Sequence, residues 1–305
     1  KRNRDEQIAG SRVEVAPFKK DPADFVLWKP SNDEQPGWNS PWGYGRPGWH
    51  TECSAMSEKT LGLPFDIHGG GRDLTFPHHE NEIAQSCCSS AGTSDPKSYV
   101  NYWMHNGFVT VNGEKMSKSL GNISLVKDLT EDNHGEVIRL SLLSSHYRQA
   151  LDWNDKVVHQ AKKLLDKLYK VLSDLKDIKP SEINESSMSI ISPLLDDLNT
   201  PGLLANLNKM IKEFKNISDK DLPEFKSKLL LANELMGICQ EDHLDWFNHD
   251  KEGLDTNMID ALILERLDAK KNKNFDKADS IRQQLLDMNI EIKDTESGTD
   301  WTLKV

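Results

Sequence analysis

A change of hydrophobic period near residue 150 is the feature that most constrains the fold of this chain. Before that point glycine, tryptophan and histidine gather in three segments, at 36–50, 68–82 and 102–108. Short apolar runs between turn signals, Asp24–Leu27 and Phe65–Ile67, predict buried strands joined by functional loops. Phe108–Val111 followed by Asn112–Gly113 and Glu114–Lys115 predicts a strand that ends in a tight Asn-Gly turn.

After residue 155 the period is helical. Apolar residues recur at i, i+3, i+4 and i+7 from Val157 to Leu175, with lysines and aspartates opposite, and this stretch is expected to end near Lys179–Pro180. A polar linker, Ser181–Ser189, is expected next. A helix with Pro201 in its first turn, running to about Ile217, and a third at Leu222–Ile238 complete a predicted helical bundle.

The last segment, 254–305, has a pattern of its own. It predicts two helices, Asn257–Lys271 and Asp276–Met288, then a short strand at Ile290–Ile292 and a turn at Gly298 that leads into Trp301–Val305. We therefore expect an α/β first part, an all-α bundle and a small mixed α/β terminal module.

Composition bounds the function. Apolar residues make up 36% and charged residues 29%, which suits a packed protein, and neither a signal peptide nor a run of 18 apolar residues is present, so a cytoplasmic location is expected. The formal charge of −11 argues against indiscriminate nucleic-acid binding but leaves room for a specific RNA contact. For the four cysteines, metal binding or burial is favoured over disulfides.

Cys53, His78 and Glu82 form a candidate metal site. His78 and Glu82 lie four residues apart in a segment that suits a helix, so their side chains should share one face. Thiolate, imidazole and carboxylate are all normal zinc ligands. The alternative is a polar helix start with acids near its positive end. A metalloprotease HExxH motif is excluded, because Ile83 stands where the second histidine is needed.

Two further segments suit a nucleotide. HGGGRD at 68–73 offers Gly69, Gly70 and Gly71 for close backbone approach and Asp73 for ribose hydroxyls, although such text is also typical of an ordinary glycine turn. KMSKS at 115–119 offers Lys115 and Lys118 to charge that develops on phosphates.

GRPGWHTECSAM at 45–56, FDIHGGGRDLTFPHHENEIAQS at 65–86 and the intact KMSKS together resemble the cysteinyl-tRNA synthetases, a class I aminoacyl-tRNA synthetase family. The resemblance implies one Zn²⁺ held by Cys53, His78 and Glu82 with a further cysteine from an earlier segment. A zinc ion with an open position binds a substrate thiolate much better than a hydroxyl, which would separate cysteine from serine without editing.

The same resemblance assigns the substrates. Trp49, His50 and His68 are expected around the bound L-cysteine. Lys118, helped by Lys115, is expected to act on the phosphates of ATP, which is used with Mg²⁺. The adenosine side is expected at Gly69–Gly71, Asp73 and His105. We thus expect ATP, L-cysteine and tRNA(Cys) as partners of a monomer that binds no membrane.

The resemblance also divides the chain. Residues 1–130 correspond to the C-terminal part of a Rossmann-type catalytic domain, 131–154 to a stem-contact connection, 155–250 to a tRNA-binding bundle and 254–305 to an anticodon-binding module. The tRNA contacts that it implies are Arg148, Lys270, Lys271 and Trp301, although a helix cap or salt bridge is the favoured interpretation of Arg148. A helical salt-bridge network with a core tryptophan is the competing interpretation for the terminal module.

The family's first nucleotide-binding half, with its HIGH-type motif and early zinc cysteine, is not found in these residues, so the chain alone is not expected to complete aminoacylation. Two alternatives stay open. One is an ATP-dependent ligase that joins cysteine to an amino sugar, which would not need segment 254–305. The other is a non-catalytic fragment that binds zinc and tRNA.

Overall fold

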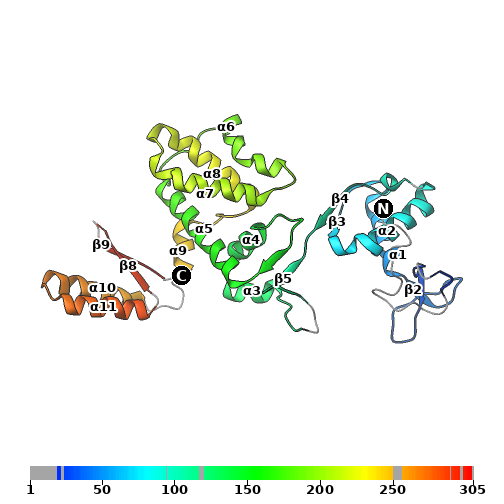
Figure 1. Cartoon of the computed structure of the whole chain (residues 1–305), viewed down its shortest axis with the longest axis horizontal. Coiled ribbons are helices and arrows are strands. Elements are labelled where there is room, and N and C mark those ends of the chain that lie inside the picture. The colour runs from blue at the N-terminus through cyan, green and yellow to red at the C-terminus, as the bar shows by residue number, and fades with distance from the viewer. Residues whose placement is uncertain are drawn as a thin grey trace. The chain divides into compact units, whose positions relative to one another are not determined.

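A computed structural model of the chain describes residues 19–21, 24–93, 95–116, 120–249, 256–288, 290–295 and 298–303. They form a mixed α/β protein that divides into two compact units, residues 1–108 and 109–305 (Figure 1). The domain boundaries expected from the sequence, at 130, 154 and 250, remain predictions.

The first unit contains two pairs of strands. β1 (Trp28–Pro30) and β2 (Gly45–Pro47) are antiparallel, whereas β3 (Phe65–Gly71) and β4 (Val100–Asn106) are parallel. α1 (Trp49–Leu61) precedes β3, and α2 (Glu80–Ser86) lies in the crossover between β3 and β4. Parallel neighbours need such a long connection, and here the connection carries the histidine-rich segment.

The prediction of a buried strand at Asp24–Leu27 is wrong. The first strand begins only at Trp28, where pairing with Pro47 starts. Val26 and Leu27 are 39% and 57% exposed, so the burial that an apolar run usually signals does not occur there.

The strand predicted at Phe65–Ile67 is confirmed, but it extends to Gly71, and its predicted burial holds for Phe65 only, since Ile67 is 61% exposed. Pairing with β4 continues as far as Gly71 opposite Asn106, which a three-residue apolar run did not indicate. A small core anchors the beginning of both strands; its buried members are Phe65, Cys87, Tyr99 and Val100. The carboxyl ends of the two strands, with Gly70 opposite His105, lie beyond the buried members of this core.

The second unit opens with a three-stranded sheet. Its order is β6 (Glu114–Lys115), β5 (Val109–Val111) and β7 (Leu151–Trp153), with β5 and β7 parallel. The predicted Asn-Gly turn is confirmed, because Asn112 and Gly113 have φ of 52° and 81°, the left-handed values that a two-residue hairpin turn requires. Asp152 Oδ1 accepts hydrogen bonds from Gly113 N at 2.6 Å and Thr110 Oγ1 at 2.8 Å.

The segment from residue 126 to 249 is mainly helical: α3 (Val126–Asp132), α4 (Gly135–Leu143), α5 (Asp155–Asp174), α6 (Glu185–Met188), α7 (Thr200–Glu213), α8 (Leu222–Met236) and α9 (His243–His249). The apolar face predicted for α5 is the buried one, with Ala161, Leu165 and Leu168 in a core shared with α4, α7 and α8. Asn154 caps α5 by accepting from Val157 N at 3.0 Å.

α5 ends at Asp174, five residues before the predicted boundary. Lys226 of α8 donates to the carbonyls of Leu175 at 2.9 Å and Ile178 at 2.7 Å. A side chain from another helix thus satisfies the carbonyls that a longer α5 would have bonded internally. The predicted linker Ser181–Ser189 is also partly wrong, since Asn184 caps the short helix α6 within it.

The terminal segment consists of α10 (Thr256–Lys271), α11 (Phe275–Asp287) and the hairpin β8 (Ile290–Thr295) with β9 (Gly298–Leu303). The strand predicted at Ile290–Ile292 is longer because it pairs along its whole length with β9. The buried core of this terminal segment consists of Ile259, Ile263, Ile281, Leu285 and Ile290. No helix in the described part of the chain has the length and apolarity needed to cross a membrane.

Candidate metal and substrate site

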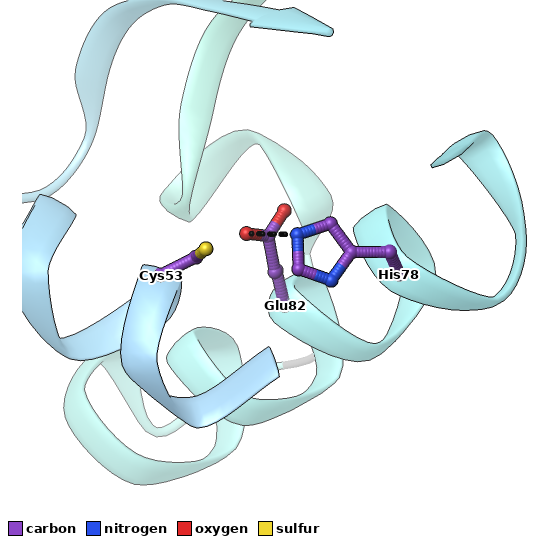
Figure 2. Close-up of side chains that lie close together, drawn as sticks. All are labelled: Cys53, His78 and Glu82. Atoms are coloured by element: carbon purple, nitrogen blue, oxygen red, sulfur yellow. Dashed lines mark ion pairs between the residues drawn. The ribbon is translucent and has the colours of Figure 1, made fainter. Parts of the chain in front are cut away.

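The three predicted metal ligands meet within the first unit. Cys53 projects from α1, Glu82 from α2, and His78 from the irregular helical turn Thr75–His79 that leads into α2. Figure 2 shows the three side chains directed at one another, and their ligand atoms all lie within 4.8 Å. The packing of α1 against α2 therefore joins a cysteine to a histidine and a glutamate that follow far along the chain.

The charges around Glu82 favour a cation. Its side chain is fully buried, and although His78 Nε2 lies 3.2 Å from Oε1, no described group donates a hydrogen bond to that oxygen. Burial alone would raise the pKa of Glu82, but a hydrogen bond from His68 and the charges of nearby histidines lower it, so the carboxylate is ionised. Burial, then the charge of Glu82, raises the pKa of the Cys53 thiol.

A divalent ion fits these residues. It would give Glu82 Oε1 the partner it lacks. Its positive charge would also favour the thiolate form of Cys53, and so oppose the negative charge of Glu82, which raises the pKa of that thiol. Sulfur, nitrogen and oxygen donors at short mutual range are the donor set that zinc prefers.

Trp49 and His50, predicted near the substrate, both contact the candidate ligand His78. The indole of Trp49 stacks on the His78 ring with centroids 4.3 Å apart, and His50 Nδ1 lies 2.7 Å from His78 Nδ1. Burial lowers the pKa of both histidines, which favours the neutral imidazole that binds metals. Trp49 is 55% exposed, so a large part of its side chain beside His78 is accessible.

His68, also predicted near the substrate, donates to the other carboxylate oxygen. His68 Nε2 lies 2.9 Å from Glu82 Oε2, and its ring stacks on Trp103 of β4 with centroids 4.5 Å apart. All three predicted substrate residues therefore surround the two ligands His78 and Glu82. The structure places them there; that they bind cysteine remains a prediction.

His79 and Trp103 are site residues that the sequence reasoning missed. His79 Nδ1 lies 2.9 Å from His105 Nε2, and burial, then neighbouring histidines, lower its pKa to about 4. With His68 and Glu82 it forms a second group whose ligand atoms lie within 4.8 Å of one another. Trp103 and His105 alternate along β4 and so share a face, a pattern visible in the sequence.

The glycine segment lies at the carboxyl end of β3. A Cβ at Gly70 would stand 2.7 Å from His79 Nε2, so glycine is needed for that ring to occupy its place, whereas a Cβ at Gly69 would meet nothing closer than 4.0 Å. Asp73 follows in the turn Arg72–Leu74, and a Cβ at Gly71 would stand 2.5 Å from its Oδ1. Packing thus explains part of the glycine run, and the nucleotide role of Gly69, Gly70, Gly71 and Asp73 is a prediction.

The predicted ATP lysines belong to the second unit. Lys115 is exposed at the end of β6, immediately after the Asn-Gly turn. Lys118 lies outside the described residues.

The predicted tRNA contacts have partners of their own. Arg148 Nε lies 2.6 Å from Asp197 Oδ2, and Lys270 Nζ lies 2.6 Å from Asp294 Oδ2. Trp301 packs on the terminal core and donates from Nε1 to Asp260 at 3.2 Å. In the terminal module, the Lys270–Asp294 pair and the partly buried Trp301 are compatible with the competing interpretation, and Lys271 is exposed. Contact with tRNA at these residues and at Arg148 stays a prediction.

Comparison with known proteins shows the family of this chain. The sequence model described as the catalytic domain of the class I (C) tRNA synthetases matches residues 1–163. The chain therefore belongs to the class I aminoacyl-tRNA synthetases. Within that class its relatives are the cysteinyl enzymes, which confirms the resemblance drawn from the motifs.

A cysteine–tRNA ligase of Parvibaculum lavamentivorans is 50% identical over 98% of this chain and 64% of its own length. One from Xanthomonas campestris pv. campestris is 49% identical over 99% of this chain and 65% of its own length. The chain thus spans about two thirds of these relatives. Among solved structures, the Agrobacterium radiobacter LeuRS–tRNA–LeuAMS complex aligns with a TM-score of 0.49 and 15% identity, over 66% of this chain and 31% of its own.

Proposed function

We propose that this chain serves as a cysteine–tRNA ligase, which activates L-cysteine with ATP to cysteinyl-adenylate and transfers it to tRNA(Cys). The observation that carries the proposal is the convergence of Cys53, His78 and Glu82 within 4.8 Å, in a chain that is 50% identical to a cysteine–tRNA ligase. The third of the relatives' length that it does not span is needed for full activity in this proposal.

Cys53, His78 and Glu82 would hold one Zn²⁺. As a Lewis acid, that ion would bind the thiolate of the substrate cysteine more tightly than the hydroxyl of serine. The residues around it do the rest. Trp49 stacks on the ring of His78, and His50 lies 2.7 Å from the same imidazole. These two residues therefore orient His78 and limit the space for the side chain of the substrate amino acid. His68 orients Glu82 through its 2.9 Å hydrogen bond.

For the nucleotide, Gly69–Gly71 and Asp73 would bind the ribose side and His105 the adenine side. Gly70 and His105 face each other across β3 and β4, which supports one shared surface. Lys118, with Lys115, would stabilise charge that develops on the pyrophosphate while Mg²⁺ neutralises the phosphates. We further propose that Arg148, Lys270, Lys271 and Trp301 face tRNA, and that the protein is a cytoplasmic monomer.

The activity is tested by ATP–pyrophosphate exchange with cysteine and with serine, alongside charging of tRNA(Cys). The chain alone and the chain extended by the upstream segment of its relatives are compared. Cysteine-dependent exchange and charging by the extended form support the proposal. Exchange without charging would instead favour the amino-sugar ligase, and the absence of both from the extended form refutes a ligase.

The metal ligands are tested by zinc content. About one zinc per chain is expected, with loss in Cys53→Ser and Glu82→Ala, because removing one donor leaves an inadequate set. Cys88→Ser and Glu80→Ala are matched controls, since both side chains are exposed in the same unit. Unchanged zinc in the two ligand variants would contradict the assignment.

A further inference from the structure

The two oxygens of Glu82 face different histidines. Oε1 lies 3.2 Å from His78 Nε2, and Oε2 lies 2.9 Å from His68 Nε2. The carboxylate is fully buried, so neither oxygen can turn to water. A carboxylate in this position can bridge two metal ions, which in dinuclear sites stand about 3.5–4 Å apart.

Glu82 also belongs to a second candidate donor group, with His68 and His79. One ligand atom from each of His68, His79 and Glu82 lies within 4.8 Å of the others, and none of the three atoms is a sulfur. Imidazole and carboxylate donors suit zinc and the neighbouring divalent transition metals.

These two histidines are held in place by their surroundings. His68 stacks on Trp103 at 4.5 Å, and His79 contacts His105 through a 2.9 Å nitrogen–nitrogen approach. The His79 ring occupies the space above Gly70 that any Cβ would fill. A second layer of this kind is what orients the histidines of metal sites.

We propose that His68, His79 and Glu82 form a second site for a divalent transition metal, which shares Glu82 with the Cys53 site. The second site is the weaker one, because it lacks a thiolate and its carboxylate also serves another dication. The two donor groups overlap in one residue only, so they can be occupied together and removed separately.

Cobalt(II) is the probe, since zinc has no visible spectrum. Wild-type chain, freed of metal, is expected to bind two equivalents of cobalt. The tighter one gives a near-ultraviolet thiolate-to-metal band, and the weaker one gives only visible bands. His79→Gln should bind one equivalent and keep the thiolate band, whereas Cys53→Ser should lose that band and retain the other equivalent.

Three results would overturn the second site. They are a single equivalent in wild type at saturating cobalt, two equivalents in folded His79→Gln, or the loss of both from that variant while its circular dichroism is unchanged. Because wild-type stoichiometry decides by itself, the test does not depend on the variant folding.

Gly70 and Gly69 give a matched pair that leaves all ligands intact. Gly70→Ala displaces the His79 ring and should weaken the second equivalent by about tenfold, as loss of outer support does in metal sites. Gly69→Ala has room for its Cβ and should leave both equivalents unchanged. Equal effects of the two substitutions would contradict the placement of His79 in the site.

One consequence rests on the proposed function. His68 is among the residues proposed to surround the substrate, so zinc beyond one equivalent should inhibit cysteine-dependent exchange by the extended enzyme in competition with cysteine. Inhibition that cysteine does not relieve would contradict this consequence. The cobalt titration needs no activity, so two equivalents without any exchange would refute the proposed function and leave the second site standing.

Discussion

At the scale of single residues, Glu136 shows how one buried carboxylate joins distant segments. It lies on α4 and accepts from Cys239 N and Gln240 N, both at 2.8 Å, and from Tyr169 Oη at 3.1 Å. Cys239 has a φ of 53°, a left-handed value, so the chain turns sharply after α8 at the two residues whose N–H groups donate to Glu136. Three segments of the second unit thus meet at this side chain, which was not among the residues that the sequence singled out.

Glu136→Ala should lower the free energy of unfolding by about 3 kcal/mol, because two backbone N–H groups and a buried hydroxyl lose their acceptor. Glu131→Ala is the control, since Glu131 is exposed on α3, and it should change stability by less than about 0.5 kcal/mol. Urea denaturation followed by circular dichroism measures both. Equal effects would mean that water replaces the carboxylate at no cost.

At the scale of elements, the β5–β6 hairpin depends on a backbone conformation more than on contacts. Gly113 has a φ of 81°, and a Cβ there would meet nothing within 4 Å. Steric fit therefore permits a side chain while the left-handed backbone disfavours it.

Gly113→Ala is expected to cost about 1 kcal/mol of stability. Gly135→Ala, at the start of α4 and equally free of clashes, should instead be neutral or stabilise, because alanine favours a helix. Opposite signs in the two melting temperatures support the turn geometry. A loss of the same size in both would indicate that Gly135, too, has a conformational role.

The terminal module has a charged clasp at Asp294. Its carboxylate accepts from Arg266 at 2.8 Å and 3.2 Å, from Lys270 at 2.6 Å and from Thr299 at 2.8 Å. These bonds, that from Arg266 foremost, hold the pKa of Asp294 well below its ordinary value. The clasp ties β8 to α10 and to β9.

Because that pKa is lowered by folding, the clasp stabilises the module above the unfolded pKa of about 4, and the contribution declines as pH falls below it. Asp294→Asn should cost about 1 kcal/mol at pH 7, after screening of this half-exposed group, and progressively less in acid. Hydrogen exchange of α10 and β8 measures the difference, with exposed Asp279→Asn as control. A cost that does not change between pH 7 and pH 3 would contradict the clasp.

At the scale of the whole molecule, all proposed metal ligands belong to the unit of residues 1–108. Metal at one hundred times its dissociation constant stabilises the state that binds it by about 2.7 kcal/mol. We expect zinc to slow hydrogen exchange in α1, α2 and β3 and to leave α5, α7 and α8 unchanged. Protection that spreads equally to those three helices would show that the two units unfold together.

Local patterns in the sequence determined much of this protein. Three features depend on neighbours within a few residues. They are the start and buried face of α5, the Asn-Gly turn, and the four-residue spacing that brings His78 next to Glu82. The motif text also determined the family, and it singled out three candidate metal ligands whose side chains lie together in the structure.

Only the tertiary structure decided what depends on partners distant in the chain. Lys226 binds the carbonyls that follow the end of α5. The register of β3 with β4 places Gly70 opposite His105. Val26 is exposed, although it lies in an apolar run that predicted a buried strand. The group formed by His68, His79 and Glu82 belongs here as well. Such features come from packing and hydrogen-bond satisfaction between segments, which short-range periodicity does not encode.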